Sequence, residues 1–162
     1  MRIAFFFLFL CSFALTACTG SERELSRENS LQETGKSDMT DQMIDVTLKI
    51  GDQVFSAKLY HHQTALAFVE KLPLSINMND HNRNEKFYNF PYALPEDSVR
   101  PGEIHAGDIM LYGDNCLVLF YESFSSTYRY TRMGFIEDAE RFAQAAGAGG
   151  VTVAFDLAEN RK

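Results

Sequence analysis

The segment PGEIHAGDIMLYGDNCLVLFYESF, residues 101–124, decides the fold class of this chain of 162 residues. It contains two dense apolar runs, residues 109–112 and 116–121, with the turn-forming Gly113, Asp114 and Asn115 between them. Short apolar runs that are joined by such a turn are typical of a β-hairpin. The segment therefore predicts two paired strands.

The sequence on either side of this hairpin repeats the same pattern of strands and turns. Residues 46–50 alternate between apolar and polar side chains, a Gly-Asp pair follows, and residues 54–60 are predicted to be the second strand of a hairpin. Further strands are predicted over residues 74–78, 127–136 and 151–155. Between the second and third strands, Gln63 or Thr64 is expected to cap a short helix over residues 65–71, with Leu66 on its inward face.

A second short helix is predicted over residues 139–146, where Asp138 provides the cap and a run of glycines provides the stop. Seven or eight short strands with two small helices favour a closed barrel, because closure removes the sheet edges that would otherwise aggregate. The predicted fold is mainly β. Residues 80–102 are irregular and rich in Asn, Pro and Tyr, so the sequence predicts a long functional loop there.

Four segments also resemble bacterial cyclophilin-like domains. They are LPLSINMND at residues 72–80, the hairpin segment at 101–124, TYRYTRMGFI at 127–136 and VTVAF at 151–155. The resemblance implies one barrel of about eight strands with two short helices over residues 44–157. Cyclophilins that isomerise X-Pro bonds carry Phe-His-Arg and Gln-Gly-Gly-Asp segments. Neither segment occurs in this chain, so those catalytic residues cannot be carried over.

The first residues read as a secretory signal, because Arg2 precedes an almost uninterrupted apolar run that ends near Leu15. Leu15, Thr16, Ala17 and Cys18 resemble the bacterial lipobox. That resemblance implies a lipoprotein signal peptide over residues 1–17, acylation of Cys18 and anchoring to a lipid bilayer of the bacterial cell envelope. The alternative is an ordinary secretory peptide that is cleaved near Ala17.

Thr19 rather than an aspartate follows the cysteine, and lipoproteins of this pattern tend toward the outer membrane where the host has two membranes. Residues 18–43 are polar and contain no aromatic residue, so the sequence predicts a flexible tether there. Residues 158–162 are expected to form a C-terminal tail.

The candidate binding residues are aromatic side chains and one arginine. Tyr128, Tyr130 and Arg132 have the spacing that places alternate residues on one face of a strand, and they are predicted to form a binding wall. The expected lip of this wall comes from the long loop, and its residues are Phe87, Tyr88, Phe90 and Tyr92. Such groups suit an extended peptide or a small ligand. The alternative is that the tyrosines fill the barrel or cover its end and that the arginine is solvated.

Two further functions remain open from the sequence. One is a peptidyl-prolyl isomerase of the cell envelope in which Arg132 or Arg83 replaces the usual arginine donor. The other is a structural accessory subunit with a peptide or protein partner. The formal net charge of −7 argues against a nucleic-acid partner.

No cofactor or metal is expected, because the sequence has neither a nucleotide motif nor paired ligand spacing of a known kind. Cys116 is predicted to be a buried small side chain rather than a nucleophile. Asp108 is expected to accept backbone hydrogen bonds in a turn.

Overall fold

The computed structural model describes residues 42–159. The predicted signal peptide, Cys18 and nearly all of the predicted tether lie outside the described residues, as do the last residues of the tail. The strands are β1 Met43–Ile50, β2 Gln53–Tyr60, β3 Leu74–His81, β4 Glu85–Asn89, β5 Gly102–Ile104, β6 Asp108–Tyr112, β7 Cys116–Phe120, β8 Phe124–Ser126, β9 Thr131–Ile136 and β10 Val151–Leu157. The helices are α1 Gln63–Val69 and α2 Ala139–Ala146. Neither described helix is long and apolar enough to cross a membrane.

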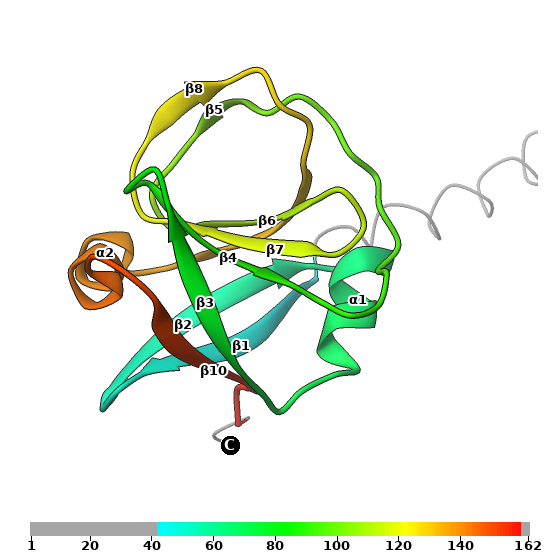
Figure 1. The fold of residues 1–162 in the computed structure, drawn as a ribbon. Helices are drawn as coiled ribbons and strands as arrows, with labels where there is room; N and C mark the ends of the chain where they lie inside the picture. The colour runs from blue at the N-terminus through cyan, green and yellow to red at the C-terminus, as the bar shows by residue number, and fades with distance from the viewer. Residues whose placement is uncertain (1–41, 160–162) are drawn as a thin grey trace, which may run out of the picture. The chain divides into compact units, whose positions relative to one another are not determined.

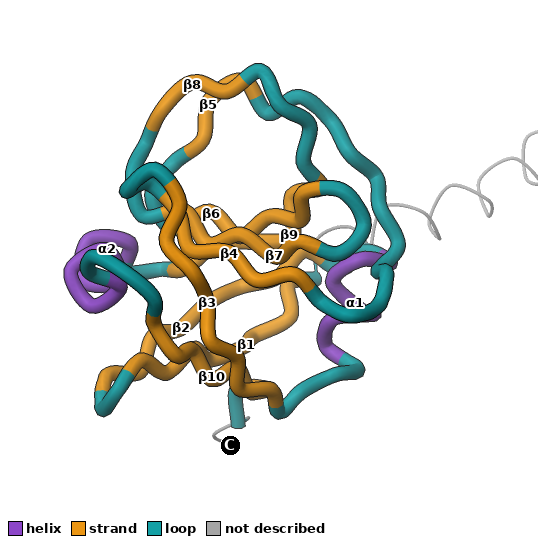
Figure 2. Tube along the Cα trace, in the orientation of Figure 1, coloured by secondary structure: helices purple, strands orange, loops and turns teal. Residues whose placement is uncertain are grey.

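Eight of these strands close into an antiparallel barrel in the order β1-β10-β3-β4-β7-β6-β9-β2, which confirms the predicted fold class (Figure 1). The two helices lie on opposite sides of the barrel in Figure 2, and each sends a phenylalanine into the main core. Phe68 of α1 packs edge-on against Phe155, and Phe142 of α2 packs edge-on against Phe55. A fully buried phenylalanine contributes about 1.5–3 kcal/mol relative to an exposed one, so each helix is held to the barrel mainly by its apolar face.

The β6–β7 hairpin carries apolar residues on both faces. Alternate residues, which include Leu111 and Leu117, point into the barrel and join the main core. The residues between them, such as Met110 and Val118, point outward and belong to a second buried cluster. Because both faces are covered, the strands read as continuous apolar runs.

The second cluster lies between the barrel and a separate two-stranded sheet formed by β5 and β8. Figure 1 shows β5 and β8 together above β6 and β7. Ile104 of β5 and Phe120 of β7 are fully buried in this cluster, and Phe124 of β8 packs against it. This small sheet therefore covers part of the outer face of the barrel.

The prediction of one long loop over residues 80–102 is wrong in its first half. The strand β3 continues to His81, and β4 pairs with it after a tight turn in which Asn82 and Arg83 adopt positive φ angles of 52° and 59°. The turn contains no glycine or proline, so the usual sequence signals are missing. Asn tolerates the left-handed region, and Asp80 Oδ1 accepts a hydrogen bond from the backbone N–H of Arg83.

The second half of this segment is irregular but held in place. Phe90 and Leu94 are buried in the main core. Their backbone N–H groups donate to carbonyl oxygens in the β6–β7 turn, at 2.8 Å and 2.6 Å. Val99 then exchanges two backbone hydrogen bonds of 2.9 Å with Tyr130.

The predicted strand over residues 127–136 begins later than expected, at Thr131. Met133 is the extra residue of a β-bulge, because Ile109 of β6 faces Gly134 and the next β6 residue faces Arg132. A side chain at Gly134 would place its Cβ atom 2.1 Å from the carbonyl oxygen of β2 residue Lys58. Only glycine permits this close approach of β9 to β2.

The helix caps differ in one case from the prediction. His62, and not Gln63 or Thr64, is the N-cap of α1, and its Nδ1 accepts from the backbone N–H of Ala65 at 3.4 Å. Leu66 is 37% exposed and does not face the core. Asp138 caps α2 as predicted, and its Oδ1 accepts from the backbone N–H of Arg141.

Lys86 of β4 has a fully buried side chain that points to the barrel side of the strand. Its ammonium donates to Asp80 Oδ2 at 2.5 Å and to the carbonyl oxygens of Gly147 and Gly149 at 2.8 Å and 2.7 Å. It also lies 4.9 Å from the ring centroid of Tyr121, whose hydroxyl donates to Asp80. The ammonium thereby joins β3 and β4 to the loop after α2.

Candidate functional site

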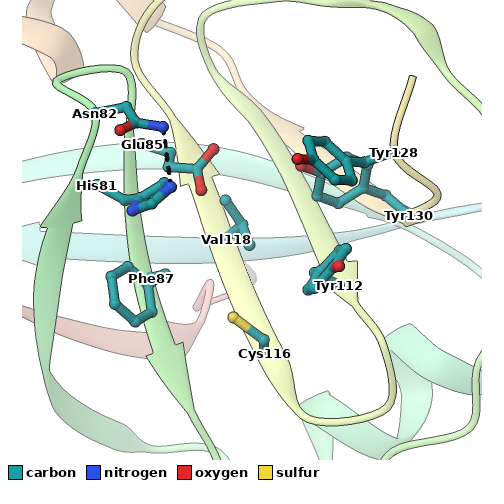
Figure 3. A pocket seen from close by; sticks show the side chains of 9 residues that line it. All are labelled: His81, Asn82, Glu85, Phe87, Tyr112, Cys116, Val118, Tyr128 and Tyr130. Atoms are coloured by element: carbon teal, nitrogen blue, oxygen red, sulfur yellow. Dashed lines mark hydrogen bonds between the residues drawn. The ribbon is translucent and has the colours of Figure 1, made fainter. Parts of the chain in front are cut away.

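An open cavity of about 350 Å³ lies on the outer face of the barrel, over β4 and β7. Figure 3 shows Val118 and Cys116 of β7 between its two sides. On β4, Phe87 faces outward because its paired residue is Val118, whose side chain belongs to the outer cluster. These three residues give the pocket an apolar base.

Three tyrosines form one side of this cavity, which is called the tyrosine pocket below (Figure 3). Tyr112 ends β6, and Tyr128 and Tyr130 come from the connection between β8 and β9. The ring centroid of Tyr112 is 6.2 Å from that of Tyr128 and 5.5 Å from that of Tyr130. Tyr130 is buried, but 64% of Tyr128 and 47% of Tyr112 are exposed, so two of the rings have free surface.

The opposite side carries polar groups from the β3–β4 hairpin. Figure 3 shows His81, Asn82 and Glu85 there, with the Glu85 carboxylate pointing toward the middle of the pocket. Asn82 Nδ2 lies 2.9 Å from His81 Nε2. An amide nitrogen only donates, so His81 Nε2 is the acceptor in this contact. The His81 ring also packs edge-on against Phe87, at 6.1 Å between centroids.

Burial changes the acidity of three groups at this site. Partial burial raises the pKa of Glu85 above its usual value; His81 opposes this effect in part, and Asp80 adds to it. Burial and the nearby Glu85 raise the pKa of the Cys116 thiol to about 11. Burial is also the main reason why the pKa of Tyr130 rises to about 12. Cys116 and Tyr130 are therefore neutral at physiological pH, and Glu85 is the acidic group that can ionise there.

Comparison with known proteins places the chain in a family. A family model that is described as the Cyclophilin-like family matches residues 48–156, which include the end of β1, all of β2 to β9 and all of β10 but its last residue. The chain belongs to the cyclophilin-like family. A search of curated proteins found no match.

The cyclophilin-like domain is also similar to the solution structure of the hypothetical protein AF2241 from Archaeoglobus fulgidus. The two chains share 16% sequence identity with a TM-score of 0.51, and the match covers 72% of this chain and 95% of the archaeal one. At this identity the likeness supports the fold and carries no residue-level function.

The structure separates the four aromatic residues that were predicted to form one lip. Phe87 lines the pocket of the cyclophilin-like domain, whereas Tyr88, Phe90 and Tyr92 pack against the main core on the other side of β4. Phe90 stacks on Tyr92 with centroids 5.0 Å apart and contacts Phe68 of α1. This separation follows from strand geometry, because neighbouring residues of a strand point to opposite faces.

Arg132 does not line the tyrosine pocket. Its guanidinium donates to the carbonyl oxygen of Glu103 at 3.0 Å and lies 3.5 Å from Asp108 Oδ2. The arginine therefore joins β9 to β5 and β6, while the expectation of one strand face fails because Tyr128 precedes the strand. Asp108 also accepts the backbone N–H of His105, so its predicted turn role is confirmed. Arg83 lies in the β3–β4 turn.

A second cavity, of about 390 Å³, lies beside Arg132. Its lining includes His62, Glu96 and Asp97, together with Val99 and Pro95. Its polar side chains are partly committed, since His62 Nε2 lies 2.8 Å from the carbonyl oxygen of Arg132 and also caps α1 through Nδ1. The tyrosine pocket is therefore the better candidate site.

Tyr112, His81, Asn82 and Glu85 also line the pocket, but they were not among the predicted binding residues. Tyr112 carried a usable signal, because it lies two residues after Met110 and must face the same side of β6. The other three lie in or beside a turn that the sequence did not reveal.

Proposed function

We propose that the cyclophilin-like domain is a binding module that holds an extended peptide or a small ligand in the tyrosine pocket. The observation that carries this proposal is the pairing of exposed tyrosine rings with a half-buried Glu85 across one open cavity. Concave sites with apolar walls and a few convergent polar groups are the usual form of a ligand site.

The side chains that line the tyrosine pocket favour ligand binding over catalysis. Tyr112 and Tyr128 expose ring surface that a ligand would cover, and tyrosine gives a large contact area with little loss of side-chain entropy. The thiol of Cys116 is held in its protonated form, which is a poor nucleophile. The site therefore supports recognition without covalent change.

The prolyl isomerase alternative gains no support from the placement of the two arginines. Arg132 already donates to a backbone carbonyl and faces a carboxylate, so its donors are engaged. Arg83 lies in a tight turn and lines neither of the two cavities described above. To act as the replacement donor, Arg132 would have to give up these contacts, or Arg83 would have to leave the turn.

The proposal includes a membrane anchor. The lipobox-like residues 15–18 support acylation of Cys18 and attachment of the domain to a bilayer of the bacterial cell envelope, the outer membrane in a host with two membranes. Mass spectrometry of the amino terminus of protein purified from its native membrane tests this. A diacylglyceryl group on Cys18 is expected, and an unmodified Cys18 or a terminus elsewhere would contradict the anchor.

The binding site itself can be tested with fluorine NMR. The full-length protein, in a non-ionic detergent, is labelled with 3-fluorotyrosine, and its 7 tyrosines are assigned with Tyr→Phe variants. The probes are a library of short extended peptides, some with proline, and of small aliphatic and aromatic compounds. At least one probe is expected to shift Tyr112, Tyr128 and Tyr130 and to lose its effect on the other two in Tyr128→Ala.

Tyr60 provides the matched control, because it lies at the end of β2 and packs against His62 rather than at the pocket. Tyr60→Ala is expected to leave binding unchanged. Shifts confined to Tyr88 and Tyr92, or no shift with any probe, would reject the tyrosine pocket as the ligand site.

A further inference from the structure

The side of the pocket that is formed by Tyr112, Tyr128 and Tyr130 offers a surface that attracts cations. The faces of aromatic rings carry partial negative charge, and a cation within about 6 Å of a ring centroid is stabilised by it. The three rings lie close enough to act on one bound group, with centroids 5.5 Å and 6.2 Å from that of Tyr112. Two of them retain exposed surface toward the pocket side.

Glu85 adds a formal negative charge across from these rings. Among residues 42–159, no hydrogen bond or ion pair engages its carboxylate. The groups that face it are His81 and Asp80 of β3, Cys116 of β7 and Tyr130 before β9. Burial keeps Cys116 and Tyr130 neutral, Asp80 is already held by Lys86, and His81 Nε2 is in contact with Asn82.

The lining contains no lysine or arginine that would compensate Glu85, and its one basic side chain, His81, is already in contact with Asn82. An anionic ligand would be repelled by Glu85, and a neutral ligand without a hydrogen-bond donor would cover the carboxylate without satisfying it, at a cost in desolvation. A ligand with an N–H cation would donate to the carboxylate and lie against the tyrosine faces at the same time.

We infer that the tyrosine pocket recognises an alkylammonium group, with its nitrogen between Glu85 and the tyrosine rings and its apolar stem over Val118, Cys116 and Phe87. This inference rests on the proposed function and names the chemical class of the ligand. The group can come from a free alkylamine or from the side chain of a lysine in a peptide. Both sources present the same ammonium on a methylene stem.

Three probes with the same butyl stem separate charge from apolar contact. They are n-butylammonium, n-butanol and butyrate, and each is titrated at about pH 7 into the full-length fluorotyrosine-labelled protein. Butylammonium is expected to bind about tenfold tighter than butanol, the size of effect that a partly desolvated cation on aromatic rings can give. Butyrate is expected to bind more weakly than butanol.

A peptide arm distinguishes the two sources of the ammonium. N-acetyl-lysine methylamide is compared with the same compound acetylated on its side-chain nitrogen, which removes the charge. Preference for the charged form, with tighter binding than butylammonium, identifies a peptide lysine as the ligand. Tighter binding of butylammonium identifies a free amine.

Matched variants test the two parts of the site separately. Glu85→Gln keeps the shape of the side chain and is expected to reduce the preference for butylammonium over butanol about tenfold. Glu137→Gln, which changes a carboxylate paired with Lys58 far along the chain, is expected to leave it unchanged. Tyr128→Phe is expected to keep the preference, and Tyr128→Leu to reduce it, because leucine retains apolar area but not the ring.

Two results would overturn the inference. Equal or tighter binding of butanol or butyrate would show a pocket that binds ligands without selecting a cation, and the proposed function would stand. No response to butylammonium or to the lysine compound would also overturn it, and the proposed function would fall only if the wider library leaves the pocket tyrosines unshifted as well. If Glu85→Gln does not fold, Tyr128→Leu and Tyr128→Phe still decide between the outcomes.

Discussion

The Lys86→Met substitution removes a buried ammonium whose three acceptors come from different parts of the chain. Asp80 lies on β3, whereas Gly147 and Gly149 lie in the loop between α2 and β10. Methionine fills nearly the same space as the lysine stem but can donate no hydrogen bond. The substitution therefore tests the polar contacts separately from the packing.

The expected loss follows from the number and kind of these contacts. Each hydrogen bond to a charged group contributes about 1.5–3 kcal/mol, but the desolvation of the lysine offsets part of the sum. Removing one member of a buried ion pair typically costs about 3–5 kcal/mol. We expect the lower end for Lys86, about 3 kcal/mol, because its partner carboxylate is 16% exposed and keeps the Tyr121 hydroxyl as a donor. In a domain of this size the melting temperature would fall by about 10 °C.

Chemical and thermal unfolding followed by circular dichroism measures this loss. The control is the Lys86→Met/Asp80→Asn double variant, which leaves no unpaired charge and is expected to be more stable than Lys86→Met alone. A loss below about 1 kcal/mol for Lys86→Met, or a double variant whose loss equals the sum of the two single losses, would refute the reasoning.

The acid dependence of stability provides a second readout of the same contact. Lys86, and then Tyr121, lowers the pKa of Asp80 below its usual 3.8 in the folded state. The contribution of this carboxylate is thus complete above that unfolded value and is lost as the pH falls through the lower folded value. Lys86→Met is expected to weaken this acid-induced loss, and an unchanged dependence below about pH 4 would contradict the assignment.

Three further predictions concern the outer face of the barrel. Burial raises the pKa of Glu85 above its usual 4.5, so the ionised carboxylate destabilises the fold at a pH above the raised value. Glu85→Gln is therefore expected to raise the melting temperature at about pH 7 and to have little effect near pH 4. A lower melting temperature of the variant at pH 7 would contradict this. The pKa of the Cys116 thiol is raised from 9.0 to about 11, so the thiol is expected to react with iodoacetamide about a hundredfold more slowly in the folded protein than in urea. Mass spectrometry of the Cys116 peptide follows the reaction. Similar rates in the two conditions would contradict the prediction. Arg132→Ala is expected to leave the isomerisation rate of a proline peptide at the uncatalysed rate, as in the wild type, and to cost less than about 1 kcal/mol in stability; catalysis that the substitution abolishes would restore the isomerase alternative.

The sequence predicted the barrel because its strands carry their own signals. Dense apolar runs at residues 109–112 and 116–121 with a polar turn between them form a hairpin under almost any arrangement of the rest. The β3–β4 hairpin lacked such a signal, since its turn at Asn82 and Arg83 has neither glycine nor proline. What fixes that turn is the pairing of β4 with β7, a long-range contact.

The site was harder to predict for a related reason. Phe87 and Tyr88 are adjacent and similar in chemistry, yet one faces the pocket and the other the core. Which one faces outward depends on the register of β4 against Val118 of β7, and a shift of one residue would exchange them. Tyr128 and Tyr130 were predicted from their chemistry and do line the pocket. Arg132 does not, because its guanidinium contacts Asp108 and the carbonyl oxygen of Glu103, which lie far from it in the sequence.

The central claim is that the tyrosine pocket is where this domain binds its ligand, and fluorine NMR of the 3-fluorotyrosine-labelled full-length protein tests it most directly. When butylammonium or a lysine-containing compound is added, the account predicts that the resonances of Tyr112, Tyr128 and Tyr130 shift together, while that of Tyr60 stays in place. Shifts at Tyr88 and Tyr92 with the pocket resonances unmoved would contradict it.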